Sequence, residues 1–262
     1  MPQIYRTMRR HPFFFSVLLL LPCISRAQSH LPPEPYGGTD AVHWMLDQEM
    51  VFPEAALAAG TENEVAVAFD VLRDGTTRNM RVTKPLDPAC DAEALRLVKL
   101  IRWLPATTSG TPLDTDHSIA IPFSAKKYRK AHAKASCERP PFDRPADASG
   151  KLYGERTIDT LAVPLVKGGI RGLPAYISGN LKYPQEAFRR DIQGKVTIEF
   201  VVETSGNLSN VRPLEFLGAG CDDEAMRLIR SICWMPAIEK GQRVRSILRL
   251  DIQFRLDPSK RP

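Results

Sequence analysis

The chain has 262 residues, 43% of them hydrophobic, and its 36 Lys and Arg against 30 Asp and Glu give a formal charge of +6. The first 27 residues contain four arginines and no acidic residue, so residues 28–262 carry only +2. This small excess is weak evidence for nucleic-acid binding, and no RNA- or DNA-binding motif accompanies it. We therefore expect no nucleic-acid partner.

Residues 1–27 have the pattern of a signal peptide. Arg6, Arg9 and Arg10 give a positive start, residues 13–21 form an apolar run, and Ala27 ends a small-residue cleavage site. The run is shorter than the roughly 20 residues that a membrane-spanning helix needs. The sequence predicts cleavage after Ala27 and an exported protein, with a retained N-terminal membrane anchor as the alternative.

The rest of the chain repeats itself. Residues 33–123 align without a gap on residues 164–254 at a shift of 131, and 25 of the 91 pairs are identical. Ordinary composition would give about five or six identities. Identity spread over a whole unit indicates two copies of one small domain. We assign the first, divergent copy to residues 28–125 and the second copy to residues 160–262.

The first copy is expected to have the same order of elements as the second copy, and its clearest parts are a strand, a turn and a final strand. The turn is Asp74-Gly75, and the first strand has apolar residues at every second position: Val65, Val67, Phe69 and Val71. The final strand follows the same alternation over residues 113–123, although Thr115 and His117 weaken its apolar face. Residues 126–159 follow with a lysine-rich run and several prolines, a composition that predicts a linker.

The second copy is easier to read. We expect a helix over residues 173–181 with Pro174 in its first turn, and a short helix over 185–191. An alternating strand spans 196–202, a turn follows at 205–207, and a return strand covers 208–216. The next helix opens at Asp222-Asp223-Glu224, where acidic residues complement the helix dipole. Its expected core face is Met226, Ile229 and Ile232.

The last strand of the second copy has the clearest alternation, from Val244 to Leu256. Three arginines lie on or beside it, at positions where the first copy has other residues. Arg243, Arg245 and Arg249 replace Pro112, Asp114 and Ser118. The order helix, helix, strand, strand, helix, strand in each copy predicts an α+β fold. Each copy is expected to be a small antiparallel sheet of about three strands with helices packed on one face.

No residue pattern predicts catalysis, a cofactor or a metal. Removal of the leader leaves Cys90, Cys137, Cys221 and Cys233, an even number that allows disulfides without requiring them. Cys221 and Cys233 flank a predicted helix and would lie about 16 Å apart, too far for a disulfide. No CxxC or zinc spacing occurs.

Cys90 and Cys221 each stand at a helix start, which can make a thiol reactive. The adjacent acids Asp91 and Asp222 oppose thiolate formation, so we expect small packed residues, and a thiol redox protein is the less favoured alternative. Trp103 and Trp234 are expected to be core anchors. The histidines His43, His117 and His132 have no partner in a hydrolase-type motif.

An ordered series of motifs in the second copy resembles a known family. The series is Tyr183-Pro184-x-x-Ala187, Gly194-x-Val196, Ser205-Gly206-Asn207-Leu208, Asp222-x-Glu224-Ala225 and Trp234-x-Pro236-Ala237. It resembles the C-terminal domain of TonB, the periplasmic energy transducer of Gram-negative bacteria, and Gly168-Gly169 and residues 220–225 look like its Bacteroidetes form. The first copy matches less strongly, at residues 52–53, 90–97 and 103–106.

The resemblance implies a periplasmic binding module that takes the TonB box of an outer-membrane receptor by strand addition to its last strand. The implied peptide-binding residues are Arg243, Val244, Arg245, Ile247, Arg249 and Asp251. Their arginines could attract an acidic peptide or protect an exposed edge from aggregation.

The resemblance is incomplete, because a full TonB keeps an inner-membrane helix and a long proline-rich spacer. Retention of residues 1–27 would instead give an atypical energy transducer. That protein would face the periplasm and couple an inner-membrane proton-motive-force motor to receptors. A further alternative is a dimer-like body of two packed copies that bind no peptide.

Overall fold

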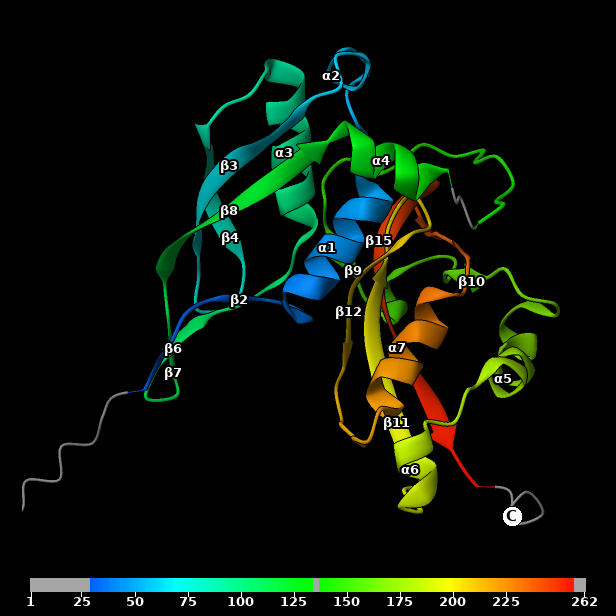
Figure 1. Ribbon diagram of the computed structural model, residues 1–262. Coiled ribbons are helices and arrows are strands. Elements are labelled where there is room, and N and C mark those ends of the chain that lie inside the picture. The colour runs from blue at the N-terminus through cyan, green and yellow to red at the C-terminus, as the bar shows by residue number, and fades with distance from the viewer. Residues whose placement is uncertain (1–28, 134–136, 257–262) are drawn as a thin grey trace, which may run out of the picture.

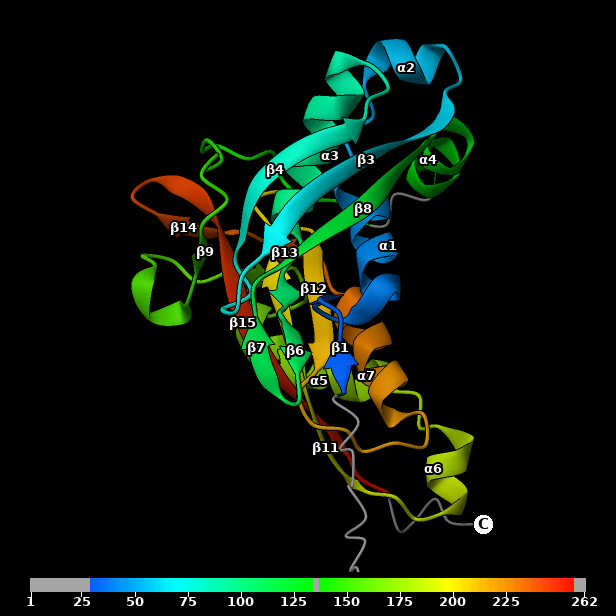
Figure 2. The same cartoon turned by 90° about the vertical axis from the view of Figure 1, so that its left-hand side faces the viewer.

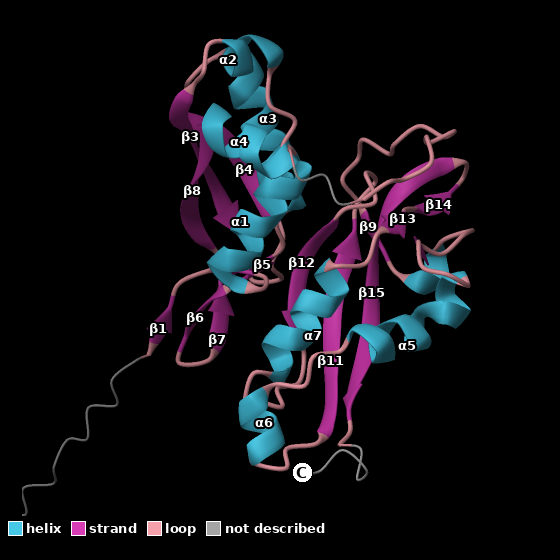
Figure 3. Cartoon of the chain, turned by 45° about the vertical axis from the view of Figure 1, so that its right-hand side comes forward, coloured by secondary structure: helices cyan, strands magenta, loops and turns pink. Residues whose placement is uncertain are grey.

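The computed structural model describes residues 29–133 and 137–256, so the expected signal peptide lies outside the described residues. Two lobes lie side by side and correspond to the two sequence copies (Figures 1 and 3). Among the described helices, none has the length and apolar character to cross a membrane.

The first lobe contains the expected series of elements with added short strands. In chain order these are β1 (His30–Leu31), β2 (Glu34–Pro35), α1 (Gly38–Glu49), α2 (Glu54–Ala58), β3 (Glu62–Val71), β4 (Thr77–Lys84), α3 (Pro88–Leu100), β5 (Trp103–Leu104), β6 (Ala106–Thr108), β7 (Thr111–Leu113) and β8 (Thr115–Ser124). The main sheet is antiparallel, in the order β4-β3-β8. Helices α1 and α3 cover one face of it, and Asp87 caps α3 by accepting the amides of Ala89 and Cys90.

The second lobe repeats this order. Its elements are β10 (Val163–Pro164), α5 (Gly169–Asn180), α6 (Gln185–Arg189), β11 (Gly194–Val202), β12 (Leu208–Pro213), α7 (Cys221–Arg230), β13 (Trp234–Met235), β14 (Ala237–Glu239) and β15 (Gln242–Phe254). The sheet runs β12-β11-β15, and β14 folds back on the start of β15. Both lobes therefore confirm the α+β class with small antiparallel sheets packed on helices.

Two helices of the second lobe differ in detail from the prediction. Helix α5 begins at Gly169, after Gly168 in the left-handed conformation, so Pro174 lies inside the helix instead of in its first turn. In α7 the buried positions include Ala225, Leu228 and Ile229, while Met226 is only half-buried. Ile229 and Ile232 of the predicted face are buried, and Met226 packs against the core while partly exposed, because a threefold spacing drifts around a helix that turns every 3.6 residues.

The segment between the copies carries structure of its own. Helix α4 (Ala125–His132) follows β8 directly, and β9 (Leu152–Tyr153) and the 3-10 turn η1 (Glu155–Thr157) lie further along. Strand β9 pairs in parallel with β15, and a disulfide joins Cys137 to Cys233.

Helix α1 joins the two lobes. Its side chains Val42, Met45 and Leu46 belong to the core of the first lobe, and Trp44 packs against the core of the second. Figure 2 shows α1 between the sheet of the first lobe and the second lobe. The residue before the helix, its N-cap Gly37, has a φ of +88°, and an added Cβ there would lie 2.7 Å from the carbonyl oxygen of Val211. Glycine allows both this turn and the close approach of the two copies.

Candidate functional site

Arg245, one of the three predicted arginines of β15, is buried against the first copy. The Arg245 side chain is 7% exposed, and its Nε lies 2.6 Å from Oε2 of Glu203, the residue that follows β11. Its Nη2 also donates to the Leu100 carbonyl of the first copy, at 2.8 Å. Arg245 and Glu203 therefore form a buried ion pair, and Arg245 contacts both copies. A binding partner from outside has no access to the Arg245 side chain.

Arg249 forms a second ion pair on the same face. Its Nη2 lies 2.8 Å from Oε2 of Glu199, and the Arg249 side chain is 66% exposed. Glu199 also accepts from Arg102 at 2.9 Å and from the hydroxyl of Tyr36, both in the first copy. Burial raises the pKa of Glu199, but the hydrogen bonds from Tyr36, Arg102 and Arg249 outweigh it and hold the pKa below its ordinary value.

The two ion pairs occur only in the second copy. At the aligned positions of the first copy, Leu72 replaces Glu203 and Asp114 replaces Arg245. Ala68 likewise stands in place of Glu199, opposite Ser118. Acid and arginine thus differ together between the copies, and this joint difference is the sequence signal that could have identified the pairs.

The other predicted site residues have separate environments. The Arg243 amide donates to Pro145, and its guanidinium lies 4.2 Å from the centre of the Phe142 ring. Val244 is buried in the core. Asp251 is exposed and accepts from Thr197. Ile247, Arg249 and Asp251 follow the segment of β15 that the residues before the second copy cover.

The free part of the β15 edge begins after Ser246. Arg243 directs its N–H and C=O outward to Pro145 and Asp147, and alternate residues of a strand face the same edge. The backbone groups of Ile247, Arg249, Asp251 and Gln253 therefore also point outward, away from β11. No strand within the described residues pairs with this stretch on that side.

A groove of about 660 Å³ runs beside this free edge. Helix α5 forms one wall and the end of β15 the other. Apart from Ser178 its helix side is apolar, and apart from Leu250 its strand side is polar. The lining residues are Ile170, Leu173, Pro174, Ile177, Ser178, Leu181, Leu250, Asp251, Gln253 and Arg255. Ile170 is 56% exposed at the mouth of the groove. An extended segment added to β15 would place alternate side chains against α5.

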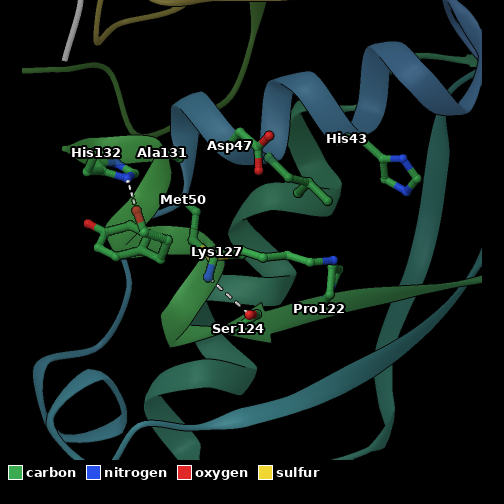
Figure 4. Close-up of a pocket in the computed structure, with 10 residues that line it drawn as sticks. His43, Asp47, Met50, Pro122, Ser124, Lys127, Ala131 and His132 are labelled. Carbon is green, nitrogen blue, oxygen red and sulfur yellow. Dashed lines mark hydrogen bonds between the residues drawn. The ribbon is translucent and has the colours of Figure 1, made fainter. Parts of the chain in front are cut away.

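The first copy has a cavity at the equivalent place, but its own chain covers it. The cavity, of about 370 Å³, lies between α1 and β8. Six of its lining residues align with the groove of the second copy at the shift of 131: His43, Leu46, Asp47, Met50, Pro122 and Ser124. Helix α4 supplies the remaining ones, including Lys127 and His132 (Figure 4). The polar side chains do not converge on one point there.

Helix α4 is held firmly over this cavity. Ser124 caps it by accepting the amide of Lys127, and the Tyr128 ring packs 5.2 Å from that of Phe52. On the strand beneath, Pro122 occupies the position of Gln253 and offers no N–H to the outer edge. The first copy therefore lacks both the space and the complete row of donors that the second copy has.

The thiols have no reactive environment. Cys90 and Cys221 are fully buried. Burial and the nearby Asp87 raise the pKa of Cys90 to about 12, and burial together with Asp222 raises the pKa of Cys221. Within the described ranges, no cluster of His, Cys, Asp and Glu could hold a metal ion. The remaining pair, Cys137 and Cys233, forms the disulfide, which sequence spacing alone could not assign.

A sequence model of the family described as the Gram-negative bacterial TonB protein C-terminal matches residues 48–125 and 179–256. The two matches together span more than half of the chain, and each falls on one lobe. The chain belongs to the TonB C-terminal family. A search of curated proteins gives no match.

TonB C-terminal domains are non-catalytic interaction domains that generally contact outer-membrane receptors. Proteins of the TonB family are periplasmic or membrane-anchored. Membership confirms the tandem arrangement, because the family pattern occurs once in each copy. In this TonB-like chain the open groove beside the last strand belongs to the second copy. Strand β8 of the first copy is also an edge strand among the described residues, but Pro122 interrupts its donors and α4 lines the adjoining cavity.

Proposed function

We propose that the protein is a periplasmic TonB-like interaction module whose second copy binds the TonB box of an outer-membrane receptor. The observation that carries the proposal is the free edge of β15 beside the α5 groove. Ile247, Arg249, Asp251 and Gln253 present unpaired backbone groups there, and main-chain hydrogen bonds to such an edge supply affinity. The peptide-binding set expected from the family thereby narrows to Ile247, Arg249 and Asp251.

Side chains of the groove would select the peptide. The α5 wall is apolar, with Leu173, Ile177 and Leu181, so residues that point toward it should be apolar. On the opposite face of the sheet, Arg249 and Asp251 already have partners on β11 and carry no unpaired charge. We therefore assign selectivity for the peptide sequence mainly to apolar contacts in the groove. Backbone pairing with β15 contributes affinity that does not depend on the peptide sequence.

The substitution Gln253→Pro tests strand addition directly. It removes one outward N–H, and the chain itself shows that this fold accommodates proline at the position, since Pro122 occupies it in the first copy. Peptides copied from the TonB boxes of receptors encoded in the same genome are titrated into residues 28–262. We expect Gln253→Pro to weaken binding at least about tenfold, because one edge hydrogen bond is lost and the edge is distorted.

The matched control is Gln253→Ala. It removes the side-chain hydrogen bond to the Gly194 carbonyl but keeps the backbone N–H. This variant should bind like the unchanged protein, and both variants should keep the circular dichroism spectrum. Equal peptide affinity in a folded Gln253→Pro protein would rule out strand addition at this edge.

Export and processing belong to the same proposal and need their own measurement. The expected leader, residues 1–27, lies outside the described residues. Mass spectrometry of the mature protein should find Gln28 at its N-terminus. A mature chain that still carries residues 1–27 would support the membrane-anchored energy transducer instead.

A further inference from the structure

A strap formed by residues 137–153 lies along the first part of the same β15 edge. Pro145 accepts the amide of Arg243 at 2.8 Å, and the amide of Asp147 donates to the Arg243 carbonyl at 2.8 Å. Strand β9 then pairs in parallel with β15, with Leu152 beside Arg245. The strap thus uses the backbone groups of residues 243–246 in the way an added strand would.

The start of the strap is fixed to the second copy. Cys137 is bonded to Cys233. Two residues later, the Arg139 guanidinium donates to the carbonyls of Trp234 at 3.1 Å and Gly206 at 3.0 Å. Its Nη2 also donates to the side chain of Asn207 at 2.9 Å. These contacts keep the strap close to β15 whether or not it is paired with the edge.

The middle of the strap buries little surface. Asp143, Arg144, Pro145 and Ala146 are all exposed. Side chains of β15 contact the strap at three places: the Arg243 guanidinium lies against the Phe142 ring and donates to the Arg144 carbonyl at 2.8 Å, and Arg245 donates to the Gly150 carbonyl at 3.0 Å. A segment that is held mainly by hydrogen bonds and buries little apolar surface can leave its strand while the core stays folded. The strap is therefore the most easily displaced of the segments that pair with β15.

The first copy cannot pair with a strap in the same way. Pro112 stands where the second copy has Arg243, and it has no N–H for a carbonyl such as that of Pro145. The strap thus occurs on the copy whose edge is open further along, at residues 247–254. Strap and free stretch together form one continuous edge, occupied at its start and vacant toward its end.

We propose that the strap is a built-in competitor that limits how far a partner can pair along β15. While it is in place, strand addition is confined to residues 247–254. A partner segment that also pairs with residues 243–246 must first displace the strap. This inference rests on the proposed function for its partner, but the detachment of the strap can be measured without one.

Amide hydrogen exchange on residues 28–262 tests whether the strap detaches locally. The variant Phe142→Ala removes the ring contact with Arg243, and Phe216→Ala is the matched control because Phe216 is 78% exposed on a distant loop. We expect Phe142→Ala to raise exchange at the Arg243 amide about tenfold and to leave the Leu250 amide unchanged. Equal protection of Arg243 in all three proteins would overturn the proposal.

A second experiment asks whether the vacated edge accepts another strand. Residues 141–153 are replaced by a Gly-Ser segment of equal length, and the probe is a fluorescent peptide with the sequence of residues 143–154. We expect the replaced protein to bind the probe at least about tenfold more tightly than the unchanged protein, where the tethered strap has a high effective concentration.

The two outcomes separate the strap from the proposed function. Failure of the replaced protein to capture the probe, with its spectrum unchanged, would overturn the competitor role. Capture of the probe without any binding of receptor peptides, in either protein, would count against the receptor proposal and leave the strap inference standing. Should the replacement unfold the protein, the exchange rates of Phe142→Ala decide alone.

Discussion

At the scale of single residues, burial separates two arginines that look alike in the sequence. Arg245 and Arg249 lie four positions apart on the same face of β15. Arg249 pairs with Glu199 of β11, and Arg245 pairs with Glu203, the residue that follows β11. Arg245 is enclosed between the copies, whereas most of the Arg249 side chain is exposed to solvent. Alternation along the strand predicts their shared face but gives no information about what covers it.

This difference predicts unequal costs of substitution. Arg245→Ala leaves Glu203 as a buried, unpaired charge, which should lower the free energy of unfolding by about 3–5 kcal/mol. Arg249→Ala leaves Glu199 with Arg102 and should cost about 1 kcal/mol or less. Urea denaturation of the two variants measures both values. Similar losses for the two arginines would contradict the buried role of Arg245.

Glu199 should make the contact between the copies sensitive to acid. Its pKa lies below the ordinary 4.5 in the folded protein, so the folded state binds the proton less readily than the unfolded chain. The stabilisation is present above pH 4.5 and is lost as the pH falls through the folded-state pKa. The stability of Glu199→Gln should therefore fall less than that of the unchanged protein between about pH 6 and pH 3, as followed by thermal melts. Parallel pH profiles of the two proteins would show that ionised Glu199 does not stabilise the fold in this pH range.

At the scale of elements, the repeat predicted most of the main strands and helices. Gly75 and Gly206 show why: in both, an added Cβ would lie 2.4 Å from the carbonyl oxygen of the tryptophan in that copy. Such steric requirements are local and survive in both copies. The structure of the segment between the copies was harder to predict, because the strap acquires its conformation from β15 and from the bond at Cys137.

Helix α4 covers the cavity of the first copy, and we expect this cover to prevent peptide binding there. Pro122→Gln restores the missing edge donor, but α4 still covers the cavity, so this variant alone should gain no peptide binding. Adding Tyr128→Ser removes the ring that packs on Phe52 and should loosen α4. We expect only the double variant to bind receptor peptides through the first copy, detected in a Gln253→Pro background. Binding by the single variant would show that α4 is no barrier.

At the scale of the whole molecule, the candidate site depends on how the copies pack, which the sequence could not predict. The first copy covers the Arg245 and Glu199 part of the arginine-bearing face of the second sheet, while the corresponding residues of β8, such as Ser118 and Ala120, are exposed. Two copies of similar sequence thus occupy different environments. The predicted peptide-binding residues all belong to β15, but the strap pairs with the backbone of Arg243 and the first copy covers Arg245. The sequence of the second copy could not predict this cover, because both covering segments lie outside it.

Two neighbouring glycines test the packing of the copies. Gly37 and Gly38 both have positive φ, so Ala is strained at either position. Only at Gly37 would the new Cβ lie within 3 Å of other atoms, those of Val211 and Ala41. Gly37→Ala should therefore lower the free energy of unfolding by about 1–3 kcal/mol more than Gly38→Ala. Calorimetry measures the difference, and equal losses would argue against tight contact at β12.

The disulfide between Cys137 and Cys233 should keep the protein in one piece after a single proteolytic cut, as long as the disulfide is not reduced. It closes a chain segment with a sequence separation of 96 residues, which includes the exposed middle of the strap. A protease that cuts once between the two cysteines would therefore nick the backbone without releasing a fragment. The two pieces should migrate together on a non-reducing gel and separate only after a thiol reagent is added.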